Sequence, residues 1–104
     1  ALDSLEGDRQ AGASADAALF YAERFDAAAA LGASLFERFG EAEDAYNAAC
    51  SHSRAGRADQ GLSWLERAVE AGFRDLDQLD SDDDLAAVRA LAGYAMVRDR
   101  VTSS

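Results

Sequence analysis

The chain has 104 residues and a hydrophobic fraction of 49%, which suits one small globular domain and argues against general disorder. Its 20 acidic and 10 basic residues give a formal charge of −10. That charge opposes binding to nucleic acid or to an anionic membrane surface, whereas a basic or neutral polypeptide partner is compatible with it. No apolar run approaches the roughly 20 residues of a membrane span.

The amino-acid usage favours helices. Alanine, the strongest helix former, appears 25 times, while proline, lysine and isoleucine are absent. No segment shows the alternating pattern of a strand, so we expect an all-α fold. Cys50 is the single cysteine, cannot form an internal disulfide, and is expected to be a small buried hydrophobe. It gives a slight preference for a reducing, cytoplasmic compartment.

In chain order, residues 1–13 contain two glycines and several charges without a sustained apolar stripe, so they are predicted to be a flexible lead-in. Ser14 is a suitable N-cap for a first helix. Its predicted buried stripe consists of Ala15, Ala18, Leu19 and Ala22. A tight break at 24–26 follows, with Asp26 as the cap of a second helix. The predicted stripe of that helix is Ala28, Leu31, Leu35 and Phe39, and the two helices form a first hairpin over 14–41.

A second hairpin is predicted over residues 42–73, with helices at 42–54 and about 60–71. Gly56 supplies the left-handed turn between them, Asp59 is the predicted cap, and Gly72 ends the second helix. Ala45, Ala48, Ala49 and His52 are predicted to share one face of the first helix, and His52 is expected to be a packed or groove-edge residue. On the second helix, Gly61, Leu65 and Ala68 are aligned.

Residues 74–104 are predicted to form capping helices. A short turn at 75–79 precedes a helix that begins at Ser81 or Asp82 and that Gly93 can divide. The predicted stripe is Leu85, Val88, Leu91 and Met96.

The two hairpins repeat with a period of 33, which is the offset from Asp26 to Asp59 and from Ala28 to Gly61. Residues 42–75 resemble a tetratricopeptide repeat (TPR). The matching residues are Tyr46, Asn47, Ala48, Ala49, Gly56, Asp59, Leu65 and Ala68. The "L-x-x-D-x-D-L" run formed by Leu79, Asp82, Asp84 and Leu85 resembles the capping tail of many bacterial TPR proteins. The resemblance implies antiparallel helical hairpins, stacked as a short right-handed superhelix with a C-terminal capping helix in a single domain over 14–104.

Six aspartates lie between residues 75 and 84, a composition that can bind a hard cation. The run lacks the spacing of an EF-hand loop, so helix capping and solvation are the preferred interpretation, and we predict no metal and no cofactor. Cys50 and His52 are two positions apart on a helix and diverge, so they cannot act together as a nucleophile and its base. We therefore predict no catalytic residue and no enzymatic activity.

The first helix of each hairpin lines the concave face of such a stack. The predicted groove residues are Glu43, Tyr46, Asn47, Cys50, Ser53 and Arg54. Tyr46 and Cys50 have an alternative role, which is packing against the preceding hairpin. Trp64 is expected to pack on the capping helix, with an exposed anchor for a partner as the alternative.

The predicted function is a protein–protein interaction module that binds a protein or peptide in its concave groove. The alternative is a structural or self-associating accessory domain of a larger protein without an open groove.

Overall fold

The protein is all-α. The computed structural model describes the backbone of residues 2–103 and the side chains of residues 7–103. No strand occurs in this part of the chain, which confirms the predicted fold class. The helices in chain order are α1 (Leu2–Tyr21), α2 (Phe25–Phe39), α3 (Ala42–Arg54), α4 (Ala58–Glu70), α5 (Leu76–Ser81), the 3-10 turn η1 (Asp83–Leu85), α6 (Ala86–Arg89) and α7 (Tyr94–Thr102).

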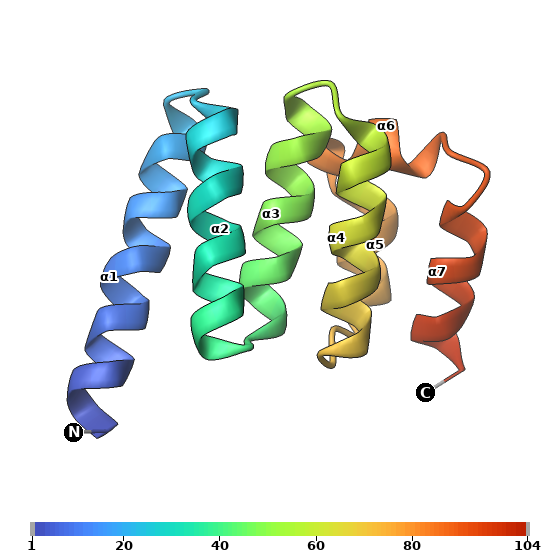
Figure 1. The fold of residues 1–104 in the computed structure, drawn as a ribbon. Coiled ribbons are helices and arrows are strands. Elements are labelled where there is room, and N and C mark those ends of the chain that lie inside the picture. Colours follow the sequence, from blue (N-terminus) through green and yellow to red (C-terminus); the bar gives the residue numbers. More distant parts are fainter. Residues whose placement is uncertain (1, 104) are drawn as a thin grey trace.

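The first four helices stand side by side in chain order, and each packs against its neighbour (Figure 1). The short α5 lies behind α4, and α7 closes the far side of the array by packing on α4. None of the helices in the described part of the chain combines the length and apolarity that a membrane crossing requires.

The largest group of buried apolar side chains joins the second hairpin to the C-terminal helices. It consists of Ala45, Tyr46, Ala49, Cys50, Leu65, Ala68, Val69, Leu79, Leu85, Val88, Tyr94, Val97 and Val101. The first hairpin contributes partly buried Phe20 and Phe36 to its edge. Gly61 permits the close approach within this group, since a Cβ there would lie 2.9 Å from Val88 Cγ2 and 3.1 Å from the Ala49 carbonyl oxygen.

The 33-residue period is visible in the turns that close the two hairpins. The amides of Ala22, Glu23 and Arg24 donate to the carbonyls of Ala18, Phe20 and Leu19, respectively. At positions offset by 33, those of Ala55, Gly56 and Arg57 donate to the carbonyls of Ser51, Ser53 and His52. Both central residues have left-handed backbones, with φ of 61° at Glu23 and 84° at Gly56. The two turns therefore have the same geometry, as predicted for Gly56, although only one of them has glycine at the strained position.

The start of the first helix was predicted wrongly. The proposed lead-in is helical from Leu2 onward, and Ser14 lies inside α1 rather than at its N-cap. The predicted stripe is also wrong, because Ala15, Ala18 and Ala22 are exposed. Among the side chains of α1 that the structure describes, those from residue 7 onward, the polar Asp16 is the most deeply buried, and Phe20 is partly buried one turn later.

The predicted helix caps were displaced by two residues. Arg24 and Arg57 occupy the N-cap positions, while Asp26 and Asp59 lie in the first turns of α2 and α4. Carboxylates in a first turn still interact favourably with the helix dipole, which explains why they appear there. Gly72, with φ of 117°, follows α4 as predicted.

The C-terminal segment is divided more finely than predicted. The side chain of Asp82 caps η1 by accepting from the amide of Asp84, as expected, and the chain breaks before Gly93. Met96 is 73% exposed and does not belong to the buried stripe. The ring of Trp64, which was predicted to pack on the capping helix, lies edge-on against Phe36 of α2, with centroids 5.8 Å apart.

Candidate functional site

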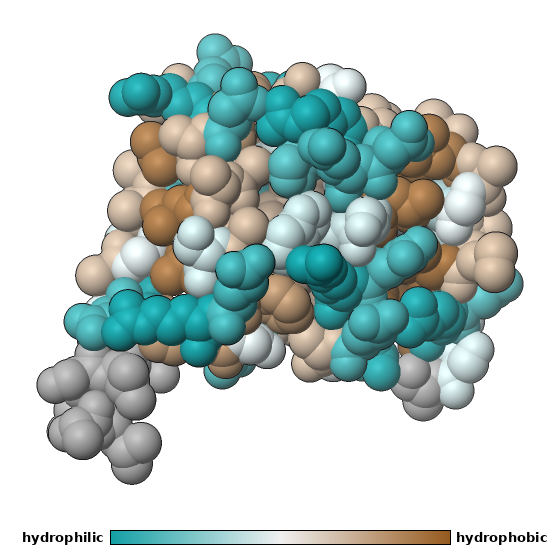
Figure 2. Space-filling model, in the orientation of Figure 1, coloured by the Kyte–Doolittle hydropathy of each residue, from teal (hydrophilic) through white to brown (hydrophobic). Residues whose placement is uncertain are grey.

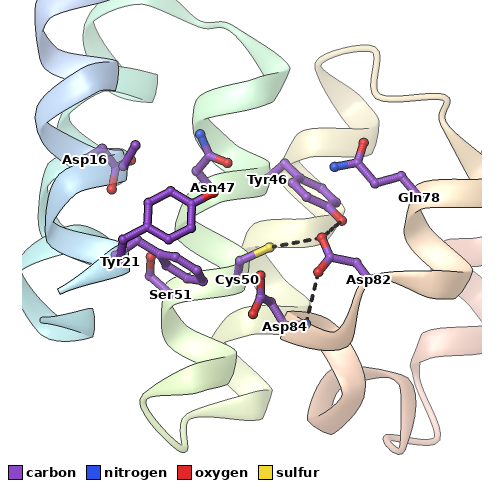
Figure 3. A pocket seen from close by; sticks show the side chains of 11 residues that line it. Asp16, Tyr21, Tyr46, Asn47, Cys50, Ser51, Gln78, Asp82 and Asp84 are labelled. Atoms are coloured by element: carbon purple, nitrogen blue, oxygen red, sulfur yellow. Dashed lines mark hydrogen bonds between the residues drawn. The ribbon is translucent and has the colours of Figure 1, made fainter. Parts of the chain in front are cut away.

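One pocket collects polar and aromatic side chains from three separate helical segments, and we call it the Asp16 pocket. Its cavity volume is about 150 Å³. The lining residues are Asp16, Ala17, Phe20 and Tyr21 from α1, Tyr46, Asn47, Cys50 and Ser51 from α3, and Gln78, Asp82 and Asp84 from α5 and η1. Figure 3 shows α1 on one side of the space and Asp82 on the other, with the α3 side chains between them.

Three of the six predicted groove residues line this pocket, namely Tyr46, Asn47 and Cys50. The other three lie elsewhere, and each has a different environment. Glu43 is exposed and forms an ion pair with Arg9. Ser53 is buried next to Gly61, one turn beyond the pocket.

Arg54 is engaged within the chain. Its guanidinium donates to Asp84 at 2.7 Å and lies 5.0 Å from the centre of the Phe25 ring. It also approaches Glu23 at 4.0 Å. Arg54 therefore joins the edge of the first hairpin to η1 and does not line the Asp16 pocket.

Tyr46 forms one wall of the pocket and is held on both sides. Its hydroxyl donates to Asp82 at 2.6 Å, and its ring stacks on Phe73 with centroids 4.6 Å apart. Burial and the bond to Asp82 raise the pKa of Tyr46, so the phenol stays protonated as a donor. Phe73 ends the second hairpin and Asp82 lies in the C-terminal segment, so neither contact is the predicted alternative of packing on the preceding hairpin.

Cys50, Asp82 and Asp84 bring potential metal ligands within 4.8 Å of one another. Each of these groups already has a role in the fold. The Cys50 thiol and the Tyr46 hydroxyl both approach Asp82, and Asp84 pairs with Arg54. Burial raises the pKa of the Cys50 thiol, which disfavours the thiolate that binds metals or acts as a nucleophile. The aspartates of residues 75–84 thus act mainly as caps and ion-pair partners.

Asp16 was not identified from the sequence, although it is the most unusual group in the pocket. It is 2% exposed, and its Oδ2 has no hydrogen-bond partner among the described residues. Burial, aided by the negative charge of Asp44, raises the pKa of Asp16 to about 6. A pattern in the sequence does indicate this position. Gly12, Asp16 and Phe20 recur every four residues, so they share one face of the helix.

Ser51 is the second group that the sequence analysis missed. Its side chain is fully buried and its Oγ also lacks a partner among the described residues. Asp16 and Ser51 are the only buried polar side chains of this part of the chain with such an atom, and both line the same pocket. Native structures leave few buried polar groups unpaired. Two such groups in the lining of one pocket therefore make it the candidate functional site.

His52 faces away from the pocket. Its Nδ1 accepts a hydrogen bond from Arg57 Nε at 3.1 Å, and burial together with the Arg57 charge lowers its pKa. Cys50 and His52 have separate partners, which agrees with the predicted divergence of their side chains.

No protein-family model matches the chain, and no solved structure matches it. A stretch of 44 residues is 41% identical to a chloroplastic protein of Arabidopsis thaliana. The similarity covers 42% of this chain and 13% of that protein.

Proposed function

We propose that the chain is a short TPR-like stack of helical hairpins whose concave face binds an extended polypeptide. The observation that carries the proposal is the origin of the residues that line the Asp16 pocket. They come from α1, α3 and the α5–η1 segment, and α2 and α4 supply none of those described. In a stack of two-helix repeats, the first helix of each repeat faces the same side and lines the binding surface.

The matching turns of the two hairpins support the same proposal. Glu23 and Gly56 are 33 positions apart and share a left-handed backbone, which supports the interpretation of the two hairpins as repeats. In this arrangement the short α5, which lies behind α4, takes the place of the first helix of a third repeat (Figure 1). The α7 helix covers the side of α4 that another hairpin would otherwise cover.

Charge indicates the kind of polypeptide. Three aspartates line the pocket, and only Asp84 among them has an ion-pair partner among the described residues, which is Arg54. Together with the net charge of −10, these unneutralised carboxylates favour a segment that carries basic side chains. The half-buried Asn47 offers an amide for hydrogen bonding to a peptide backbone.

We propose binding without catalysis. The raised pKa of Cys50 makes it a poor nucleophile, and His52 is engaged with Arg57 on another face of α3.

A peptide-display screen tests the proposed function. Random twelve-residue peptides would be selected on the full chain, and their affinities measured by fluorescence anisotropy in 0.15 M salt. We expect selected peptides to lose at least about tenfold in affinity on Asn47→Ala, the loss typical of a buried hydrogen bond. Gln60→Ala on α4 is the control and should change nothing. Failure to select any peptide, or equal loss in both variants, would contradict the proposal.

Self-association is the second candidate, and surface composition favours it. Tyr21 is 84% exposed, and Ala15, Ala18 and Ala22 expose further apolar surface on α1. Figure 2 shows hydrophobic and weakly hydrophobic residues over the α1–α2 end of the array. A mass that rises with concentration in light scattering, and that returns to the monomer value on Tyr21→Ser, would support a second copy of the chain as the partner.

A further inference from the structure

Two buried aspartates of the first and second hairpins differ in one respect. Asp44 is fully buried and receives Arg9, with Nε 3.1 Å from Oδ2 and Nη2 3.3 Å from Oδ1. Asp16 is almost equally buried and has no ion pair among the described residues. A buried carboxylate is costly unless it is paired with a cation or supplied with donors. Asp16 therefore lacks the partner that Asp44 has.

The backbone around Asp16 is shaped to make room for its carboxylate. Gly32 of α2 lies directly behind it, and a Cβ at this position would be 3.1 Å from Asp16 Oδ2 and 3.3 Å from Ala48 Cβ. The unpartnered Oδ2 of Asp16 is thus the oxygen that lies beside Gly32 of α2. The residue lines a cavity of about 150 Å³, which is below the range of roughly 300–1,000 Å³ typical of sites for drug-sized ligands. The space suits one side chain of a partner.

The remaining lining is complementary to a cation on an apolar stem. Ser51 Oγ is a buried acceptor without a partner, and Asp82 has no ion pair among the described residues. The aromatic residues Phe20, Tyr21 and Tyr46 supply apolar surface around these acceptors. In Figure 3, Asp16 and Ser51 belong to different helices on the same side of the space, with Tyr21 between them and the viewer.

From this arrangement we propose that the Asp16 pocket binds the side chain of a lysine in the partner polypeptide. The inference rests on the proposed function, because it specifies which side chain of a bound peptide enters the pocket. Lysine fits better than arginine for a geometric reason. An ammonium is a compact charge with three donors that can reach acceptors on separate helices, whereas a guanidinium pairs best with both oxygens of one carboxylate. The Oδ2 of Asp16 lies beside Gly32 of α2, which leaves less room for a planar guanidinium than for an ammonium.

The test uses single amino acids blocked at both ends. The isotope-labelled full chain would be titrated with N-acetyl-lysine methylamide in 0.15 M salt and followed by NMR. Separate titrations would use the arginine and norleucine counterparts of this compound. We expect the lysine compound to shift the amide signals of Asp16 and Ser51 and to bind at least about tenfold more tightly than the other two. Norleucine has the apolar stem without the charge, so equal binding of norleucine would overturn the inference, as would tighter binding of arginine.

Two variants keep the charge change matched. Asp16→Asn should weaken lysine binding at least about tenfold, whereas Glu37→Gln removes one exposed negative charge on α2 and should leave it unchanged. Equal effects would show that only the net charge attracts the compound, and would overturn the assignment to the pocket. Ser51→Ala retains every charge and provides a further check, with a loss of several-fold expected.

The peptide-display screen separates this inference from the proposed function. Selected peptides whose binding depends on Asn47 but not on a lysine or on Asp16 would overturn the lysine pocket and leave peptide binding intact. A screen without binders, together with unshifted Asp16 and Ser51 signals, would overturn both.

Discussion

The two hairpins share a backbone plan but solve the packing between their helices differently. The offset of 33 relates Ala49 and Leu65 in the second hairpin to Asp16 and Gly32 in the first. In the second hairpin both positions are buried and apolar, and Leu65 is among the largest fully buried side chains. In the first hairpin, the glycine makes room for a carboxylate at the corresponding place. One hairpin thus builds the core, and the other uses the same positions to build a polar pocket.

The largest effect on stability is expected from truncating a buried apolar side chain of the second hairpin. Leu65→Ala should lower the free energy of unfolding by about 3 kcal/mol, through lost burial and the cavity left behind. Leu31→Ala, at a half-buried position of α2, is the comparison and should cost less than half as much. Urea denaturation followed by circular dichroism measures both. Similar losses would show that the two hairpins contribute equally to the core.

Asp16→Asn, in the polar pocket of the first hairpin, should change the free energy of unfolding by an amount that depends on pH. The pKa of Asp16 is about 6 in the fold, against an ordinary aspartate value of 3.8, so well below pH 3.8 both states are protonated and the carboxyl costs nothing. Between these values the unfolded state ionises first, which destabilises the fold, and above pH 6 the full penalty is present. The stability of the variant relative to the wild type should therefore rise by roughly 2–3 kcal/mol from pH 3 to pH 7.

Denaturation curves for Asp16→Asn and the wild type at several pH values between 3 and 7 measure this difference. Subtraction removes the titration of groups common to both proteins, including Asp44, whose pKa burial also raises against the opposing effect of Arg9. A flat difference for Asp16→Asn would mean that its carboxyl is solvated.

Exchanging the residue types at the two left-handed turn positions, Glu23 and Gly56, should have smaller and opposite effects on stability. Glu23→Gly should raise the free energy of unfolding by about 1 kcal/mol, because glycine removes the steric cost of a left-handed backbone. Gly56→Ala should lower it by a similar amount, since the turn geometry is the same. Thermal unfolding of both variants tests whether the two turns are equivalent. A loss of stability on Glu23→Gly would indicate that the contact of Glu23 with Arg54 outweighs the strain.

The smallest effect concerns the link between the second hairpin and the C-terminal segment. Tyr46→Phe removes the hydrogen bond to Asp82 while keeping the ring that stacks on Phe73, and should cost about 0.5–1 kcal/mol. The equivalent position in the first hairpin is Ala13, which has no such ring. Chemical denaturation measures the loss. An unchanged midpoint would mean that the hydrogen bond from Tyr46 to Asp82 contributes no net stability.

The sequence predicts the second hairpin well and the first hairpin only in outline. Residues 42–54 form α3 as predicted, because small apolar residues there follow a clear helical period. In α1 the same reasoning selected exposed alanines, since hydrophobic periodicity cannot register a buried aspartate. The left-handed turn at Gly56 was foreseeable from glycine, whereas that at Glu23 is imposed by the hairpin around it.

The candidate site shows the same division. Tyr46, Asn47 and Cys50 were predicted from their place on the first helix of a repeat, and they do line one pocket. Asp16 and Ser51 were missed because their significance lies in the absence of partners, which depends on packing that no single helix specifies. Arg54 has the right charge for a groove residue, but a carboxylate 30 positions away in the chain occupies it.

The glycine behind Asp16 also constrains the order in which such a pocket can arise from an alanine–leucine pair like that of the second hairpin. Introducing the aspartate first would force a carboxylate against a full leucine side chain in a closely packed interior. Introducing the glycine first leaves only an empty space, which costs stability but keeps every buried group apolar. The two substitutions are therefore strongly epistatic, and the accessible mutational path leads through a void before it reaches a charge.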